Sequence, residues 1–382
     1  MEYKKLGDVA TYVNGYAFKP KDRGDKGLPI IRIQDLTGNS YDLGFYNGIY
    51  PQKVEINDGD ILISWSASLG IYVWNRGKAL LNQHIFKVVF DKVNIDKAYF
   101  VYAVKHKLNE MIAKTHGATM KHIIKSDFDE TVIPYPPLSE QKRISEVLKK
   151  VDKIIESRNY ELKTLDNLVK ARFVELFGDP VQNPKGWDMP LIEDIVANEK
   201  NALKAGPFGS ALKKEYYVES GYKIYGQEQV ISGDHTFGDY YIDEERYKSL
   251  ENCAVQAGDV LISLVGTYGK LLIMPEIFEP GIINPRLMKI TFDKEKVNPY
   301  YFQFFFQSES LKRSLSDSTH GGTMDILNLG IVRKIAMPLP PIELQNEFVA
   351  YVKQVDKSKV AVQKALDEAQ LLFDSLMQEY FG

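Results

Sequence analysis

The feature that most constrains the fold is an internal repeat. Residues 133–178 begin IPYPPLSEQKRISEVLKKVDKII and end ELFG, and residues 337–382 match them without a gap at a shift of 204 positions. Three shorter segments upstream also recur: THGATM (115–120) as THGGTM (319–324), GDILIS (59–64) as GDVLIS (258–263), and LLNQHIFKVVF (80–90) as IINPRLMKITF (282–292). A long period of this kind indicates one structural unit used repeatedly. The sequence therefore predicts a globular region followed by a helix, stated twice.

Both repeated helices carry apolar residues at alternating spacings of four and three. Eight of ten such positions are apolar in the first copy and nine of ten in the second. The seam residues are Ile144, Leu148, Val151, Ile155, Leu162, Leu165, Val169 and Leu176, followed by Phe348, Val352, Val355, Val362, Leu366, Phe373, Leu376 and Tyr380; the small Ala369 is the ninth apolar position of the second copy. This heptad pattern is typical of a coiled coil. We expect the two helices to pair antiparallel, with a pseudo-two-fold relation between the halves; the alternative is that each helix packs only on its own globular neighbour.

The helix ends define four segments. A Pro-Pro pair precedes each helix, and Gly178 followed by Asp-Pro ends the first, which are ordinary start and stop signals. We expect globular domains in residues 1–135 and 180–339, and long helices in residues 136–179 and 340–382. The fold class expected is α+β, with two similar mixed domains separated by the two long helices.

The globular halves are expected to be rich in short strands. The expected strands of the first half are 28–36, 61–64, 71–74 and 85–90, and helices are expected at 99–112 and 300–315. The front of the two halves, residues 6–10 and 192–196, matches so weakly that chance is an alternative explanation.

Composition bounds the compartment. The chain has 382 residues, enough for about two domains, and contains no apolar run long enough to span a membrane. Residues 1–10 lack the basic-then-apolar layout of a signal peptide. A single cysteine, Cys253, excludes an internal disulfide, and we expect it to be buried as a small apolar side chain. A cytoplasmic protein with no membrane partner is expected.

Catalytic signatures are missing from the sequence. The segment Ile-Asn-Pro-Arg at 283–286 resembles an amino-methyltransferase tetrapeptide but lacks its second proline and its aromatic residue. The segment at 266–270 resembles a phosphate-binding loop with the wrong spacing and is expected to be a turn between strands. The six histidines form no pair at metal-ligand spacing on a helix. We expect a non-catalytic chain without a metal site.

Polar residues near turns and strand ends are the candidates for ligand contact. Glycine in the repeated THG motif would let the backbone approach a phosphate, and Arg32 and Gln34, on one face of an expected strand, suit guanine and adenine edges. The full set is Arg32, Gln34, Asn82, Gln83, His84, Thr119, Lys121, His122, Lys213, Lys214, Gln227, Asn284, Arg286 and Thr323. For each of them, an ordinary role in a strand or turn is the alternative.

Net charge gives a DNA ligand no support. The chain carries −3 overall, with +3 in residues 1–132, +2 in 133–178, −5 in 179–336 and −3 in 337–382. Phosphate contacts require local positive charge rather than a global excess. If DNA is the ligand, basic groups must gather on one face or a partner must supply much of the phosphate binding.

The layout resembles the specificity subunits of type I restriction–modification enzymes. The Pro-Pro-Leu-x-Glu-Gln helix start at 136–141, the Leu-Phe-Gly helix end at 176–178 and the repeated GD(I/V)LIS and HG(A/G)TM segments carry the resemblance, which covers nearly the whole chain. Leu344 stands in the second copy where Glu140 stands in the first.

This resemblance implies a function and partners. Each target-recognition domain would read half of a bipartite site on double-stranded DNA, and the paired helices would set the spacing between the halves. Two methyltransferase subunits that modify adenine N6, and a motor-nuclease restriction subunit, would dock on the chain. S-adenosylmethionine, ATP and Mg would then bind to those partners and not to this chain. A coiled-coil adaptor that binds proteins without recognising DNA is the alternative function.

Overall fold

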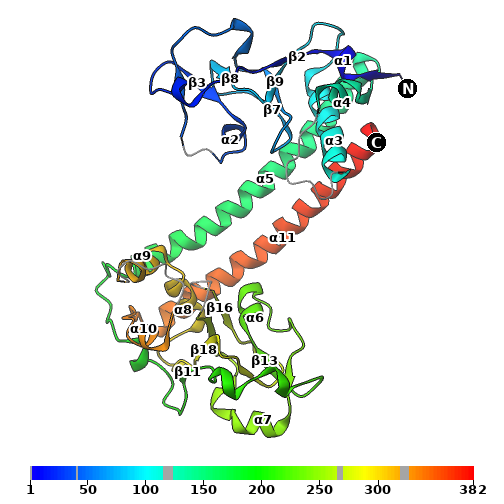
Figure 1. Cartoon of the computed structure of the whole chain (residues 1–382). Coiled ribbons are helices and arrows are strands. Elements are labelled where there is room, and N and C mark those ends of the chain that lie inside the picture. Colours follow the sequence, from blue (N-terminus) through cyan, green and yellow to red (C-terminus); the bar gives the residue numbers. More distant parts are fainter. Residues whose placement is uncertain (1, 40–41, 115–123, 265–269, 319–326) are drawn as a thin grey trace. The chain divides into compact units, whose positions relative to one another are not determined.

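The chain forms two compact units. The computed structural model describes residues 2–39, 42–114, 124–264, 270–318 and 327–382. Unit 1 comprises Met1–Tyr160 and Val362–Gly382, and unit 2 comprises Glu161–Ala361. Each unit therefore contains part of both long helices, α5 (Leu138–Phe177) and α11 (Ile342–Phe381), which Figure 1 labels.

Unit 1 combines small sheets with helices in its described part. One sheet has the antiparallel order β2 (Thr11–Asn14), β9 (Ile85–Val89), β6 (Ile61–Ser64) and β7 (Gly70–Val73). A second has the order β4 (Phe45–Tyr46), β3 (Leu28–Ile31), β8 (Ala79–Leu81) and β5 (Glu55–Ile56), in which β3 and β8 are parallel. The remaining elements are β1 (Tyr3–Lys5) paired with β10 (Val132–Pro134), and α1 (Leu6–Val9), α2 (Ile33–Leu36), α3 (Lys97–Lys114) and α4 (Lys125–Glu130).

Unit 2 repeats this plan. Its first sheet has the order β11 (Leu203–Ala205), β18 (Leu287–Ile290), β15 (Val260–Ser263) and β16 (Leu271–Ile273). Its second has the order β12 (Tyr217–Val218), β14 (Tyr241–Ile242), β13 (Tyr222–Tyr225) and β17 (Gly281–Ile283), in which β13 and β17 are parallel. The helices are α6 (Gln227–Ser232), α7 (Glu244–Ser249), α8 (Pro299–Phe306), α9 (Glu309–Ser318) and α10 (Leu329–Arg333). The predicted α+β class and internal repeat are confirmed.

The repeat extends to the front of each half, where sequence similarity was too weak to decide. The amide of Leu6 donates to the carbonyl of Thr131 at 2.8 Å, and the amide of Ile192 donates to the carbonyl of Ile335 at 2.9 Å. The same hydrogen bond thus ties the front of each unit to the segment before its long helix.

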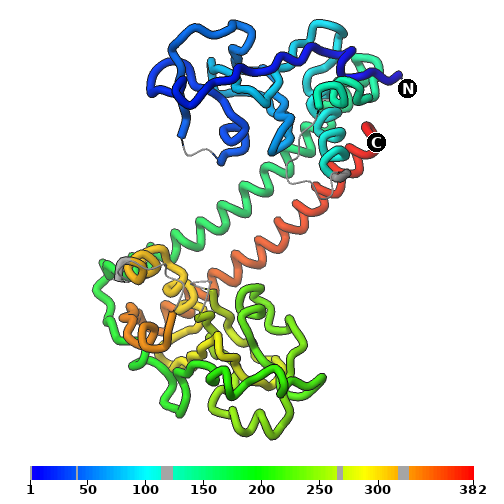
Figure 2. Tube along the Cα trace, in the orientation of Figure 1, coloured from blue at the N-terminus to red at the C-terminus, as the bar shows by residue number. Residues whose placement is uncertain are grey.

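The long helices pair antiparallel within each unit. In unit 1, Ile144 and Leu148 near the start of α5 share a buried core with Met377 and Phe381 near the end of α11. In unit 2 the roles are exchanged, and the ring centroids of Phe348 near the start of α11 and Phe177 at the end of α5 lie 5.5 Å apart. Both chain termini belong to unit 1, and Figure 2 shows α11 ending there. The expected antiparallel direction is confirmed.

Each helix end also packs on a globular region. The Phe177 ring lies 4.8 Å from that of Tyr301, and the Phe381 ring lies 5.2 Å from that of Tyr99. The hydroxyls of Tyr99 and Tyr301 donate to the carbonyls of Pro134 and Pro338, both at 2.9 Å. The sequence left helix pairing and packing on a globular neighbour as alternatives. The structure contains both.

The seam predicted from the heptads follows the buried face of the helices for most of their length. Each of its sixteen residues is buried or half-buried. Towards the C-terminal end of each helix, residues outside the seam are also buried, namely Phe173 and Phe177 and, at the matching positions, Met377 and Phe381. Here the helix faces a globular region as well as its partner helix, which widens the apolar face beyond a heptad seam.

Two predicted elements are wrong in extent. The strand expected at 28–36 ends at Ile31, because a carboxylate oxygen of Asp35 accepts the Arg32 amide at 2.8 Å and starts α2 there. The helix expected at 300–315 is two helices, α8 and α9. The hydroxyl and carbonyl of Ser308 accept the amides of Leu311 and Lys312, so a second helix starts after the break.

Two local predictions from sequence are confirmed. Gly178 ends α5 with a φ of +80°, and its amide donates to the carbonyl of Val174 at 2.8 Å. Cys253 is a buried free thiol. Within the described ranges, no helix is both long and apolar enough to cross a bilayer.

Candidate nucleic-acid interface

A short loop follows the parallel strand pair in each unit, and the two loops share two backbone hydrogen bonds. The amide of Asn82 donates to the carbonyl of Ile31 at 3.0 Å, and the amide of Asn284 donates to the carbonyl of Tyr225 at 2.8 Å. Two residues later, the carbonyl of His84 accepts the amide of Trp65, directly after β6, at 3.2 Å. In the same way, the carbonyl of Arg286 accepts the amide of Leu264, directly after β15, at 2.9 Å. We call residues 82–84 and 284–286 the strand-end loops.

The backbone of a glycine packs directly against each strand-end loop. A Cβ added to Gly15 would lie 2.0 Å from the carbonyl oxygen of Asn82, and one added to Gly206 would lie 1.9 Å from that of Asn284. Only glycine permits this approach. The backbone of each loop is therefore held by the end of a parallel strand, by the residue after β6 or β15 and by the glycine, while the side chains of the two loops differ.

In unit 1 the loop presents exposed and half-buried polar groups. Gln83 is exposed, Asn82 and His84 are half-buried, and the Asn82 side chain accepts the Gln83 amide at 2.9 Å. His84 has a φ of +73°, which is uncommon for a residue with a side chain. Its ring lies 4.9 Å from that of Trp65, and His84 Nδ1 and Trp65 Nε1 are buried without a hydrogen-bond partner among the described residues.

In unit 2 the loop presents a guanidinium. Arg286 is exposed, and its Nη1 donates to Gln227 Oε1 at 3.4 Å. Gln227 Nε2 in turn donates to Ser263 Oγ at 2.8 Å, which ties the loop to the start of α6 and the end of β15. The Asn284 side chain accepts the Arg286 amide at 2.9 Å, as an Asx turn.

Leu327, the first described residue after the repeated THG motif, contacts this place in unit 2. The amide of Leu327 donates to the carbonyl of Leu264 at 3.0 Å, and the amide of Leu264 is the group that binds the Arg286 carbonyl. The candidates Thr119, Lys121, His122 and Thr323, like the motif itself, lie outside the described residues, so their predicted role stays a prediction.

The remaining candidates divide into accessible and inaccessible residues. Arg32 was expected to project from a strand face; it is instead 9% exposed, and its guanidinium binds the Asp35 carboxylate at 3.1 Å and the Asp42 carbonyl. Arg32 is buried because β3 ends at Ile31 and Arg32 forms the N-terminal cap of α2. Gln34 is exposed on α2. Lys213 and Lys214 are exposed beside a 3-10 turn, and Lys213 forms a 3.4 Å ion pair with Glu215.

One exposed side chain was missed from the sequence. Phe208 is 89% exposed and lies two residues after Gly206, the glycine that crosses the strand-end loop of unit 2. The sequence signal was a Gly-Pro-Phe-Gly segment directly after the short segment Leu-Lys-Ala. The equivalent position in unit 1 is Ala17, two residues after Gly15.

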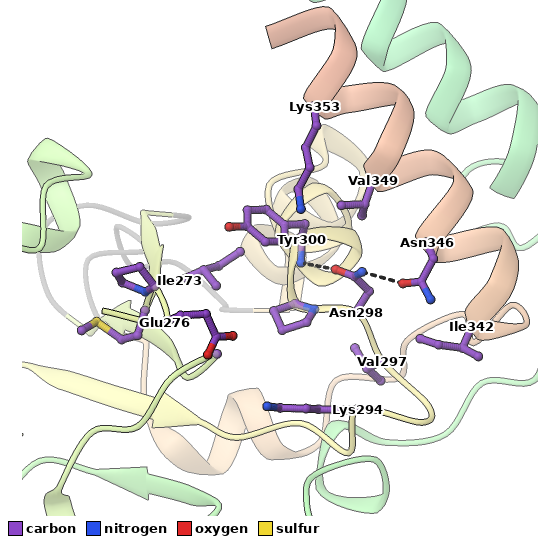
Figure 3. Close-up of a pocket in the computed structure, with 14 residues that line it drawn as sticks. Ile273, Glu276, Lys294, Val297, Asn298, Tyr300, Ile342, Asn346, Val349 and Lys353 are labelled. Atoms are coloured by element: carbon purple, nitrogen blue, oxygen red, sulfur yellow. Dashed lines mark hydrogen bonds between the residues drawn. The ribbon is translucent and has the colours of Figure 1, made fainter. Parts of the chain in front are cut away.

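Unit 2 also contains a hollow of about 380 Å³ beside the N-terminal part of α11 (Figure 3). The Asn298 amide group donates to Asn346 Oδ1 at 2.7 Å, and Lys353 Nζ lies 5.4 Å from the centre of the Tyr300 ring. Among the described residues that line it, Glu276 is the only acid and no nucleophile–base pair occurs. In the described ranges of the chain, no group of three or more metal-ligand side chains occurs.

Comparison with known families decides what the repeat belongs to. Residues 1–166 and 184–369 match the family described as "Type I restriction modification DNA specificity domain". The two matched stretches correspond to the two copies of the repeat and cover most of the chain. The chain belongs to this type I DNA specificity family.

Curated relatives and solved structures agree with the type I specificity family. The chain is 24% identical to the specificity subunit of the type I restriction enzyme EcoBI from Escherichia coli, over 98% of this chain and 83% of the relative. It is 24% identical to the MjaVIII specificity subunit from Methanocaldococcus jannaschii, over 95% and 89%. The resemblance read from the helix starts and repeated motifs is thereby confirmed.

The fold likeness spans whole chains. A structure reported for complex assembly and conformational transition of the type I R-M system superposes with a TM-score of 0.61 at 17% identity, covering 99% of this chain and 97% of the other. The S subunit of a type I restriction–modification system from M. genitalium gives 0.54 at 16% identity, covering 100% and 96%. Nothing in these comparisons favours a coiled-coil adaptor without DNA recognition.

Proposed function

We propose that this chain is the DNA-specificity subunit of a type I restriction–modification system and that each unit reads one half of a bipartite site on double-stranded DNA. The observation that carries the proposal is the pair of strand-end loops. Their backbones share two hydrogen bonds and a close glycine contact, yet they present Asn82, Gln83 and His84 in one unit and Asn284 and Arg286 in the other. A constant frame with different polar groups suits the reading of two unlike half-sites.

The low net charge is compatible with this role when phosphate binding is shared. The region 179–336 is acidic overall, so its loops alone supply few phosphate contacts. Base-edge contacts, which provide specificity, need few side chains, whereas phosphate contacts provide much of the affinity. We infer that partner subunits hold much of the DNA backbone.

The partners proposed are two methyltransferase subunits that modify adenine N6 and a motor-nuclease restriction subunit. S-adenosylmethionine, ATP and Mg would be held by those subunits. Catalytic and phosphate-loop signatures are missing from the sequence of this chain, which supports the placement of these groups on partner subunits. The long helices, which have exposed outer faces, are the proposed docking surfaces; Leu168 on α5 and Leu372 at the matching position on α11 are 47% and 50% exposed.

The decisive experiment is a modified-base map. The chain would be co-expressed with its methyltransferase subunit in a host that lacks other adenine methylation, and the genome sequenced for N6-methyladenine. The expected result is one motif with two defined halves and a spacer of undefined bases. Cells with the methyltransferase subunit alone serve as the control and should show no such motif.

The same experiment separates the alternative function. An adaptor would copurify with partners without changing which bases are methylated. A map identical with and without this chain, from cells in which both proteins are soluble and copurify, would therefore reject the specificity-subunit proposal.

A further inference from the structure

We propose that positions 84 and 286 are equivalent base-reading positions, and that Arg286 reads a guanine in the half-site bound by unit 2 while His84 reads a base in the half-site bound by unit 1. This inference rests on the proposed function and deepens it. It assigns the difference between the two half-sites, in part, to one matched pair of residues.

The backbone hydrogen bonds support the equivalence that the recurrence of residues 80–90 at 282–292 already indicates. Positions 82 and 284 both donate to the end of the parallel strand, and positions 84 and 286 both accept from the residue after the central strand. Gly15 and Gly206 cross at the same point of each loop. His84 and Arg286 therefore occupy equivalent places in the two loops, although only His84 has a positive φ and the two side chains share no chemistry.

Arg286 is well prepared to bind a base edge. Its side chain is exposed and, among the described residues, its Nη1 makes one long hydrogen bond of 3.4 Å to Gln227, whereas a guanidinium has five donors in all. The Asx turn from Asn284 fixes the backbone from which the side chain extends. A guanidinium held in this way can donate two parallel hydrogen bonds to guanine O6 and N7 in a major groove.

At the corresponding position in unit 1, His84 has a strained backbone conformation. A φ of +73° is strained for a residue with a Cβ, whereas glycine adopts it readily. Glycine would relieve that strain but would remove the imidazole. Strain retained at a loop that presents polar groups points to a use for the side chain.

The test uses the assembled methyltransferase complex and proceeds in two stages. The modified-base map of the wild-type complex first gives the bipartite motif, which tests the proposed function alone. Duplexes with that motif are then prepared with each guanine replaced in turn by 7-deazaguanine, which lacks the N7 acceptor. Binding of each duplex is measured for the wild type, Arg286→Ala and the control Arg313→Ala, which removes an exposed arginine from α9.

For the wild type, one 7-deazaguanine in one half-site should weaken binding about ten-fold. Arg286→Ala should weaken binding of the natural duplex by a similar factor and should no longer respond to that replacement. Arg313→Ala should retain the wild-type response. His84→Ala and His84→Gly should both relax base choice in the other half-site only, as read from modified-base maps of the variants.

Two outcomes would overturn the proposal while the proposed function stands. One is a bipartite motif whose guanines can all be replaced without a change in wild-type binding. The other is an Arg286→Ala complex with wild-type thermal stability and a wild-type response to every replacement. Absence of any bipartite motif for the wild type would instead reject the proposed function itself.

Discussion

At the scale of single residues, the two halves place the same ion pair in different surroundings. Lys289 Nζ lies 3.2 Å from Asp259, and Lys87 Nζ lies 2.8 Å from Asp60 at the matching position. The first pair is almost fully buried, with side chains 6% and 0% exposed, whereas the second retains 19% and 25%. Burial raises the pKa of the Asp259 carboxyl, and the nearby Lys289 opposes this effect.

We predict that Asp259→Asn lowers the free energy of unfolding by about 3–5 kcal/mol, because it leaves the Lys289 charge buried without a counter-charge. Asp60→Asn, the matched control, should cost about 1 kcal/mol or less, because water screens that pair. Urea unfolding of both variants measures the difference. Equal costs at the two positions would contradict the role given to burial.

His84 gives a second prediction at this scale. Because its φ is +73°, His84→Gly should be more stable than His84→Ala by about 1 kcal/mol, even though both remove the same imidazole. Thermal unfolding of the two variants side by side checks this order. A more stable alanine variant would mean that the loop relaxes to another backbone conformation.

At the scale of secondary-structure elements, a buried glutamine anchors the start of each long helix. Gln345 is fully buried; its Oε1 accepts the Asn298 amide at 2.9 Å, and its Nε2 donates to the carbonyls of Lys296 and Pro340 at 2.8 Å. Gln141 accepts the Asp96 amide at 2.9 Å and donates to the Pro136 carbonyl at 2.8 Å. The repeated Pro-Pro-x-x-x-Gln segment is thus a joint between helix and globular region.

We predict that Gln345→Ala lowers the free energy of unfolding by about 1–3 kcal/mol, because buried backbone groups lose their partners. Gln363→Ala removes an exposed glutamine of the same helix, which binds Asp367 one turn away, and should stay within about 0.5 kcal/mol. Chemical unfolding with a fluorescence signal measures both. A loss as small as that of the control would show that water replaces the missing amide.

The same elements show how far sequence reasoning reaches. Pro-Pro starts, the Gly178 stop and the heptads predicted α5 and α11, because helix signals are local and periodic. The end of β3 at Ile31 and the burial of Arg32 depend on one side-chain cap from Asp35, which alternating apolar residues do not reveal. The strand-end loops depend on the pairing of segments distant in sequence, so they could be suspected only from the recurrence of Asn82 at Asn284.

At the scale of the whole molecule, both long helices contribute to both units. This arrangement constrains how the spacing between half-sites can be altered. The boundary between the units crosses α5 after Tyr160 and α11 after Ala361. Because each unit pairs the start of one helix with the end of the other, an insertion in only one helix would shift the seam of its partner. Insertions must therefore be matched.

We predict that one added heptad in both helices, after Tyr160 and after Ala361, keeps the seam in register and lengthens the helix pair by about 10 Å. If the helices set the spacing between half-sites, the undefined spacer in the modified-base map should grow by about three base pairs at 3.4 Å each, with both halves unchanged. A heptad in α5 alone should reduce stability and methylation because the pairing is mismatched. An unchanged spacer in the stable, doubly extended protein would show that the helices do not determine this distance.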